Sequence, residues 1–207
     1  LHTTLGIDNF TKGLQLYMKR FAYGNTKTVD LWQSWAEVSG LPIREMMECW
    51  TGQMGYPLVT IVKQEVNGSG NSCTLTCSQS IFLADGSELG KEEKIGRKPW
   101  RIPLMIQAMG AEPYLQVIEG REATFTVQLP AGAHSWIKVN AGQPSLVRVL
   151  YTPRMVLQLC KAVETTQLPD TDRAALLSDS YALAKAGKAN ISNVFELLSV
   201  CMSDNSY

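Results

Sequence analysis

The sequence predicts a multidomain α+β protein with an α-helical segment, then an antiparallel β-sandwich of about seven strands, then a second α-helical segment. Apolar residues recur with the 3.6-residue period of a helix near both ends of the 207-residue chain, and with a period of two in between. The period changes near Tyr56 and changes back after Pro153. Helices and strands that are segregated along a chain favour separate domains over alternating β-α-β units.

Three amphipathic helices are predicted in the first segment. We expect Asp8 to cap the first helix and Thr28 to cap the second, which ends at Gly40. Pro42 opens the third, which stops near Gly52. The residues expected to face a core are Phe10, Leu14, Tyr17, Met18, Phe21, Leu31, Trp32, Trp35, Ile43, Met46, Met47 and Trp50. Tryptophans at helical spacing indicate a core rather than a platform for a ligand.

The middle of the chain alternates apolar and polar residues, as strands with one buried face do. Pro103 predicts that its strand lies at a sheet edge or a bulge, because proline has no backbone N–H to donate. The polar insert 84–98 is expected to be a mobile loop. The predicted strands are 57–63, 73–78, 100–107, 114–118, 124–129, 135–140 and 146–151.

Three more helices are predicted after the strands. The first follows Pro153, the second begins at Pro169 and runs to Gly187, and the third spans 191–202. Both helical segments are too short to cover their own apolar stripes. Together with a first residue, Leu1, that is not methionine, this leads us to expect a chain cut from a longer protein.

The composition excludes several classes of partner. Lys plus Arg number 19 and Asp plus Glu number 19, so there is no basic excess to attract nucleic acid. Apolar stretches are too short for a membrane span, and the first residues lack a signal pattern. Five cysteines, an odd number, favour reduced thiols in a cytosol. We therefore expect a cytoplasmic protein with neither nucleic-acid nor membrane partners.

Residue spacing alone predicts no catalytic, cofactor-binding or metal-binding residue. The zinc motif H-E-x-x-H is absent, since the only histidines are His2 and His134. Cys73 and Cys77 stand four positions apart on a predicted strand, about 13 Å, so they cannot chelate a metal together or form a disulfide. A nucleophile pair of His134 with a cysteine lacks any local signature and remains a minor alternative.

Two glycine-containing segments are better explained as turns or loops than as nucleotide sites. Gly68 and Gly70 precede a strand where a dinucleotide fingerprint needs a helix, so they predict a hairpin turn. The 86–91 segment lacks the spacing of a phosphate loop, and Glu92 replaces the Ser or Thr that would reach a metal. The charged run 91–94 is expected to be a solvated loop face.

Three passages together resemble the zinc aminopeptidases of the puromycin-sensitive type, a gluzincin family. Residues 25–57, which end in W-T-G-Q-M-G-Y-P, are similar to the segment that closes that family's catalytic domain. Residues 136–151 contain the pattern W-x-K-x-N, G-Q and R-V-x-Y, and 172–187 contain D-R-A-x-L-x-x-D-x-Y-x-L-A-x-A-G. The chain departs from the family at 145–147, where the family has glycine and two aromatic residues.

The resemblance implies a division into domains. Residues 1–54 would be the last helices of a thermolysin-like catalytic domain, 55–152 the β-sandwich domain, and 153–207 the start of the helical C-terminal domain. Trp136 and Tyr151 would pack between domains, and Asp172 would cap its helix.

The resemblance also implies that the family's catalytic groups lie upstream of this chain. The family uses zinc held by two histidines and a glutamate, a glutamate base, a tyrosine, and a G-x-M-E-N segment that binds the substrate amine. None of these maps onto a numbered residue here, so the chain is expected to be inactive alone, with no cofactor of its own and zinc in the parent enzyme.

The leading hypothesis is therefore a non-catalytic piece of a zinc metallo-aminopeptidase, whose parent removes N-terminal amino acids from peptides. Its role would be to link the catalytic and helical domains, and its partners would be the parent's remaining domains and the parent's peptide substrates. The alternatives are a free-standing protein-interaction module, a catalytically dead family relative, and a thiol hydrolase that uses His134.

Overall fold

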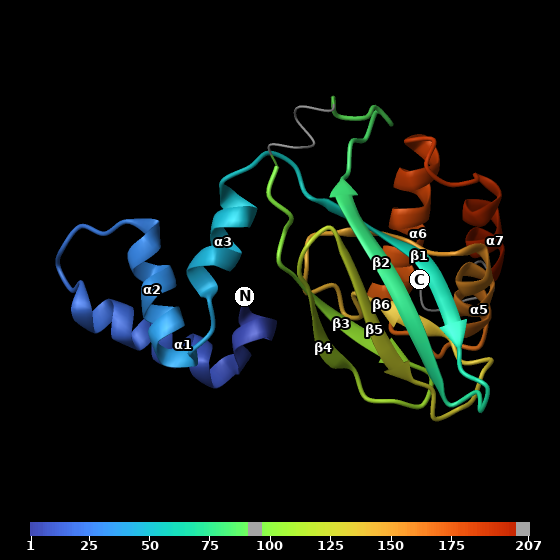
Figure 1. Ribbon diagram of the computed structural model, residues 1–207, viewed down its shortest axis with the longest axis horizontal. Coiled ribbons are helices and arrows are strands. Elements are labelled where there is room, and N and C mark those ends of the chain that lie inside the picture. Colours follow the sequence, from blue (N-terminus) through green and yellow to red (C-terminus); the bar gives the residue numbers. More distant parts are fainter. Residues whose placement is uncertain (91–96, 202–207) are drawn as a thin grey trace. The chain divides into compact units, whose positions relative to one another are not determined.

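The computed structural model describes residues 1–90 and 97–201, which form helices, then strands, then helices, as predicted (Figure 1). The chain divides into two compact units, Leu1–Met54 and Gly55–Tyr207. The charged run 91–94 and Glu92 lie outside the described residues, as does the last residue of the predicted helix 191–202. In the described part of the chain, none of the helices combines the length and the apolar composition needed to cross a bilayer.

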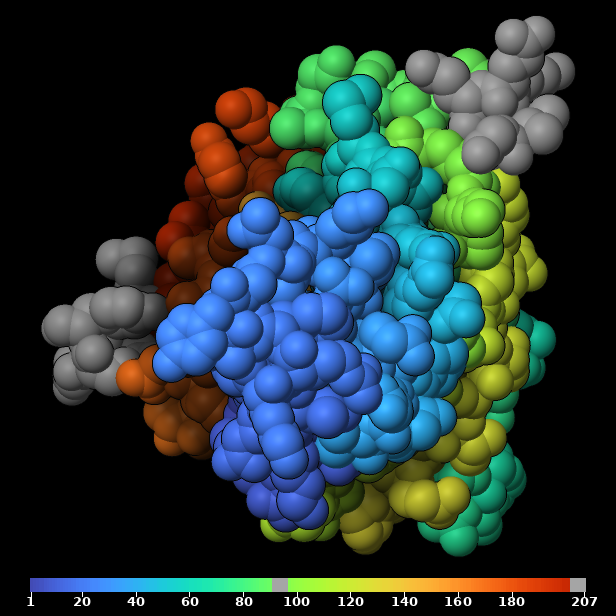
Figure 2. Space-filling model, turned by 90° about the vertical axis from the view of Figure 1, so that its left-hand side faces the viewer, coloured from blue at the N-terminus to red at the C-terminus, as the bar shows by residue number. Residues whose placement is uncertain are grey.

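The first unit consists of α1 (His2–Arg20), α2 (Thr28–Ser39) and α3 (Ile43–Thr51). Figure 2 shows them as one closely packed body, with α1 in dark blue and the other two in lighter blue. Its buried core consists of Leu5, Trp32, Trp35, Ile43 and Met46, with Trp50 packed against it. The expectation that the tryptophans form a core is therefore confirmed.

Two predicted helix caps are wrong. Helix α1 begins at His2, after Leu1, and is divided by a kink at the non-helical Gly6, which has a φ of 71°; Asp8 lies two residues beyond this kink and is not the residue that precedes α1. The residue that precedes α2 is Lys27, and its backbone N–H donates to the Asp30 carboxylate at 2.7 Å. A carboxylate in the first helical turn accepts the backbone N–H of the residue before the helix in this way in a capping box. The predicted end at Gly40 is confirmed, with a left-handed φ of 69°.

The second unit contains two sheets. A four-stranded sheet has the order β5-β2-β1-β7, and a three-stranded sheet the order β4-β3-β6. The strands are β1 (Pro57–Val66), β2 (Ser72–Ile81), β3 (Ile102–Ala108), β4 (Tyr114–Ile118), β5 (Glu122–Gln128), β6 (Ile137–Val139) and β7 (Arg148–Leu150). Strands β1 and β2 join through the predicted turn at Gly68 and Gly70 (Figure 1).

The strand pairing differs from the prediction at one place. Strand β7 pairs with β1 in parallel, with Leu58 opposite Arg148 and Thr60 opposite Leu150, whereas the other pairings are antiparallel. A parallel neighbour requires a long crossover, because a short turn reverses chain direction. Here the crossover is formed by the rest of the sandwich.

Pro103 lies in the middle strand of its sheet and pairs with β4 in unbroken register, so the prediction of an edge strand or a bulge is wrong. Strand β6 pairs with β3 only from Ile106 to Ala108, beyond the proline. On the other side Pro103 is opposite Val117 of β4, and its carbonyl accepts a hydrogen bond from the Ser145 hydroxyl. The absent N–H is tolerated because a side chain, not a strand, lies beside this part of β3.

After the strands, the described residues form the helices α5 (Pro153–Glu164), α6 (Asp170–Lys185) and α7 (Ser192–Cys201). Helix α5 packs against β6 and α7, and α6 packs against β7 and α7. In the described part of the 84–98 insert, the backbone of Gly86 packs closely against the end of α6 and has a φ of +77°. A Cβ there would overlap with the carbonyl of Ala186, just beyond α6.

Candidate functional site

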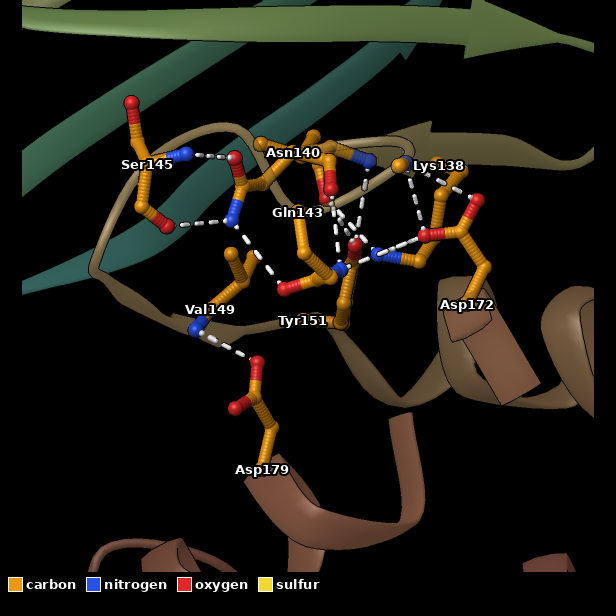
Figure 3. Close-up of polar contacts among 10 residues, drawn as sticks. Lys138, Asn140, Gln143, Ser145, Val149, Tyr151, Asp172 and Asp179 are labelled. Carbon is orange, nitrogen blue, oxygen red and sulfur yellow. Dashed lines mark hydrogen bonds and ion pairs between the residues drawn. The ribbon is translucent and has the colours of Figure 1, made fainter. Parts of the chain in front are cut away.

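A buried network of charged and amide side chains connects β6, β7 and the turn between them to helix α6 (Figure 3). Its carboxylates are Asp172, in the first turn of α6, and Asp179. They are seven residues apart, two helical turns, and therefore lie on the same face of the helix. Lys138 and Arg148 come from β6 and β7.

Lys138 and Asp172 form the deepest part of the network. Their side chains are 2% and 1% exposed, and the Lys138 Nζ lies 3.6 Å from the Asp172 Oδ1. The Lys138 Nζ also donates to the carbonyl of Val139 at 3.0 Å. Burial lowers the pKa of Lys138, and the nearby carboxylates of Asp172 and Asp179 oppose that shift.

The Asp172 carboxylate binds the turn that follows β6. It accepts the Gly142 N–H at 2.9 and 3.1 Å and the Gln143 side-chain amide at 3.2 Å. The expectation that Asp172 caps its own helix is wrong, because Pro169 precedes α6 and the carboxylate points to a different segment (Figure 3). The Gly142 N–H and the Gln143 amide instead fix the helix to the sandwich through this carboxylate.

The turn itself is fixed by side-chain hydrogen bonds. Asn140 and Gln143 both have positive φ, 59° and 57°. The Asn140 amide donates to the Gln143 Oε1 at 3.2 Å and to the carbonyl of Ser145 at 2.9 Å, and its Oδ1 accepts the Ser145 N–H. The Gln143 amide donates back to the Asn140 carbonyl at 2.9 Å. These bonds hold a backbone geometry that is uncommon for residues other than glycine.

Asp179 attaches the second half of α6 to β7. Its carboxylate accepts the Arg148 Nη1 at 2.8 Å and the backbone N–H of Val149 at 3.1 Å. Arg148 also donates to the Ser178 hydroxyl at 2.8 Å. Burial raises the pKa of Asp179, and the bonds from Arg148 and Val149 act against that rise. Across the network, two cations balance two carboxylates.

Tyr151 and Trp136 make two further bonds near the network. The Tyr151 hydroxyl donates to the Val139 carbonyl at 2.9 Å and accepts the Val139 N–H at 3.0 Å, so it binds β6 within the sandwich. Burial raises the pKa of Tyr151 well above its usual value. The Trp136 Nε1 donates to the Gln167 Oε1, in the connection between α5 and α6, at 2.6 Å. Trp136 thus contacts the helical segment, whereas Tyr151 stays within the strands.

The network holds segments together and offers little to a substrate, because its carboxylates and cations bond to each other and to the backbone. Among residues 1–90 and 97–201, no three His, Cys, Asp or Glu side chains come together as ligands for a metal ion. His134 is exposed in a turn, and in the same described ranges it makes no hydrogen bond to a cysteine.

Cys73 and Cys77 are fully buried on the inner face of β2, as predicted. Burial raises the pKa of the Cys77 thiol from its usual value near 9.0 to about 12. The folded chain therefore keeps this proton at a pH where the unfolded chain has lost it. The resulting stability is fully present below the unfolded pKa and decreases as the pH rises towards 12, by up to about 1.4 kcal/mol per pH unit.

We expect the wild type to lose more stability than Cys77→Ala between pH 8 and pH 10, as measured by urea unfolding. Ser78→Ala, at the next strand position, removes no group with this shifted pKa and serves as the control. It should change the free energy of unfolding equally at both pH values. A difference between the wild type and Cys77→Ala that does not vary with pH would contradict the assignment.

Two family models match the chain. The "Peptidase family M1 domain" matches residues 1–50, and the "ERAP1-like C-terminal domain" matches residues 136–207, which include the whole buried network. The chain is 31% identical over 202 residues to the puromycin-sensitive aminopeptidase of Caenorhabditis elegans, covering 96% of this chain and 20% of that protein.

Two other aminopeptidases match the chain with similar identity and coverage. The chain is 31% identical to aminopeptidase M1-A of Oryza sativa subsp. japonica over 214 residues, which cover 100% of this chain and 23% of the rice protein. It is 32% identical to aminopeptidase 2 of Candida albicans over 203 residues, 98% of this chain and 21% of the yeast protein. The chain thus spans about a fifth of the length of the curated relatives it matches.

Proposed function

The chain belongs to the M1 family of aminopeptidases, and from this membership we propose that it is a non-catalytic part of a zinc enzyme that removes N-terminal amino acids from peptides. In this proposal residues 1–54 complete a catalytic domain, 55–152 form the sandwich domain, and 153–207 begin a helical domain. The role of the chain is to join the catalytic and helical domains.

The observation that carries this role is the buried network between α6 and the β6–β7 region. Asp172 and Asp179 of α6 bind backbone N–H groups at Gly142 and Val149, two separate places on the sandwich. Two attachment points seven residues apart on one helix face restrict rotation as well as separation of the helix. A joint of this kind transmits a fixed orientation from one domain to the next.

The catalytic zinc and its ligands belong, in this proposal, to parts of the enzyme outside the chain. The whole protein's peptide substrates and remaining domains would be the partners. The five cysteines are free thiols, which fits a reducing compartment, so we also propose a cytoplasmic location.

Purified chain is expected to leave aminoacyl p-nitroanilides intact and to contain no stoichiometric zinc by atomic absorption. Stoichiometric zinc with cleavage of these substrates would overturn the non-catalytic assignment. His134→Ala is assayed beside the wild type to test the thiol-hydrolase alternative. If the chain were such a hydrolase, this variant would lose the activity of the wild type.

Hydrogen exchange tests the joint itself. Asp179→Ala is expected to speed amide exchange both in α6 and in β7 with its neighbour β1, because the Val149 N–H and Arg148 lose their acceptor. Helices α1 to α3 provide the internal control and should exchange unchanged. Faster exchange confined to α6 would show that the network does not couple the helix to the sandwich.

A further inference from the structure

A groove of about 500 Å³ lies in the second unit between helix α5 and the turns that flank β5 and β6. It contains none of the residues of the buried polar network. Its wall on the sandwich side includes Met109, Ala131 and Trp136.

Helix α5 contributes one continuous stripe to the groove. Arg154, Leu157, Gln158 and Lys161 follow each other at i, i+3, i+4 and i+7, and therefore lie on one helix face. Leu157 is 62% exposed, although it is a large apolar side chain. An apolar residue is thus located between two cations along the same stripe.

The charged side chains that line the groove are all positive. Arg154 and Lys161 line it, and no carboxylate does. Within residues 1–90 and 97–201, neither cation forms an ion pair. Other arginines in these ranges do form such pairs: Arg20, Arg44, Arg101, Arg148 and Arg173.

We propose that this groove binds an acidic amphipathic helix of a partner protein. Arg154 and Lys161 are seven residues apart, about 10.5 Å along α5 at 1.5 Å per residue. A partner helix lying beside α5 presents two carboxylates at the same separation when they too are seven positions apart. An apolar side chain between them packs on Leu157 and Trp136. This binding role is additional to the joining role proposed above.

The probe is a fluorescent helix-forming peptide with two glutamates seven positions apart and two leucines between them. Fluorescence anisotropy is expected to show binding that weakens as salt is added, because screening reduces attraction between exposed charges. The same peptide with lysines in place of the glutamates is expected to bind at least about tenfold more weakly, since each attraction becomes a repulsion. Equal binding of the two peptides would overturn the proposal.

Charge reversal in the chain supplies the second test. Arg154→Glu with Lys161→Glu is expected to weaken binding of the acidic peptide at least about tenfold. The matched control, Lys12→Glu with Lys185→Glu, makes the same charge change at exposed positions outside the groove and should leave binding within about twofold. Unchanged binding in the groove variant would overturn the proposal. So would sedimentation showing self-association that Leu157→Asp abolishes, because the occupant would then be a second copy of this chain.

Discussion

Replacing Asp172 with alanine is expected to destabilise the second unit by about 3–5 kcal/mol, the usual result of removing one partner from a buried ion pair. The substitution leaves the Lys138 ammonium without its nearest carboxylate at a site that is 2% exposed. It also removes the acceptor of the Gly142 N–H and of one Gln143 amide bond. Because the Lys138 side chain is buried, its charge would remain largely without a solvent partner.

Urea unfolding followed by circular dichroism measures this loss. Glu119→Ala is the matched control in the same unit, since it breaks an exposed ion pair with Arg101 and is expected to cost no more than about 1 kcal/mol. Combining Lys138→Met with Asp172→Asn removes both charges together and is expected to recover at least half of the loss. A loss below about 1 kcal/mol in Asp172→Ala would show that the pair contributes little to the joint.

In the first unit the largest effect is expected from Gly13→Val. Gly13 is buried on α1, and a Cβ there would overlap with Cδ1 of the Trp35 ring. The ring cannot easily move, because its Nε1 donates to the Phe10 carbonyl at 3.0 Å and its face stacks on Phe10 at 5.1 Å between centroids. Overpacking costs about 1–3 kcal/mol, and the lost hydrogen bond about 1 kcal/mol more.

Helix propensity acts in the opposite direction but is too small to compensate. Replacing a helical glycine with alanine usually gains about 0.5–1 kcal/mol, less than the cost of the overlap. Gly24→Ala is the control, because its nearest contact would be an ordinary 3.5 Å to the Phe21 carbonyl. We expect a change within about 0.5 kcal/mol there. Thermal unfolding, together with amide hydrogen exchange in α1 and α2, distinguishes the two variants. A Gly13→Val variant as stable as the wild type would contradict the predicted overlap with Trp35.

The order of the elements could be predicted because it depends on local periodicity. The alternation around Cys73 and Cys77 is preserved in the burial of β2, and Gly40 ends its helix through its own backbone conformation. The parallel pairing of β7 with β1 could not be predicted in this way. This pairing depends on which strand edges remain unpaired after the sandwich forms, and the residue pattern of one strand does not show which edges those are.

The buried network could not be predicted for a similar reason. Lys138 lies between Ile137 and Val139 on a strand whose three residues are all buried, so alternation gives no indication of a charged core. Asp172, an acid in the first turn of a helix, has a sufficient local explanation in the helix dipole. Only the tertiary fold brings the two residues to 3.6 Å. The family resemblance includes both residues but does not reveal that they meet.

The parallel pairing of Leu58 with Arg148 also sets an order of events during synthesis of the chain. Strand β1 leaves the ribosome long before β7 and meanwhile keeps one edge of its sheet unpaired. An unpaired edge can pair with another chain, and contacts between residues so far apart in the sequence form slowly. Completion of the sheet must therefore wait until residue 150 has emerged, and helix α6 follows directly to hold β7 through Asp179. Before that point the free edge of β1 is open to pairing with another chain.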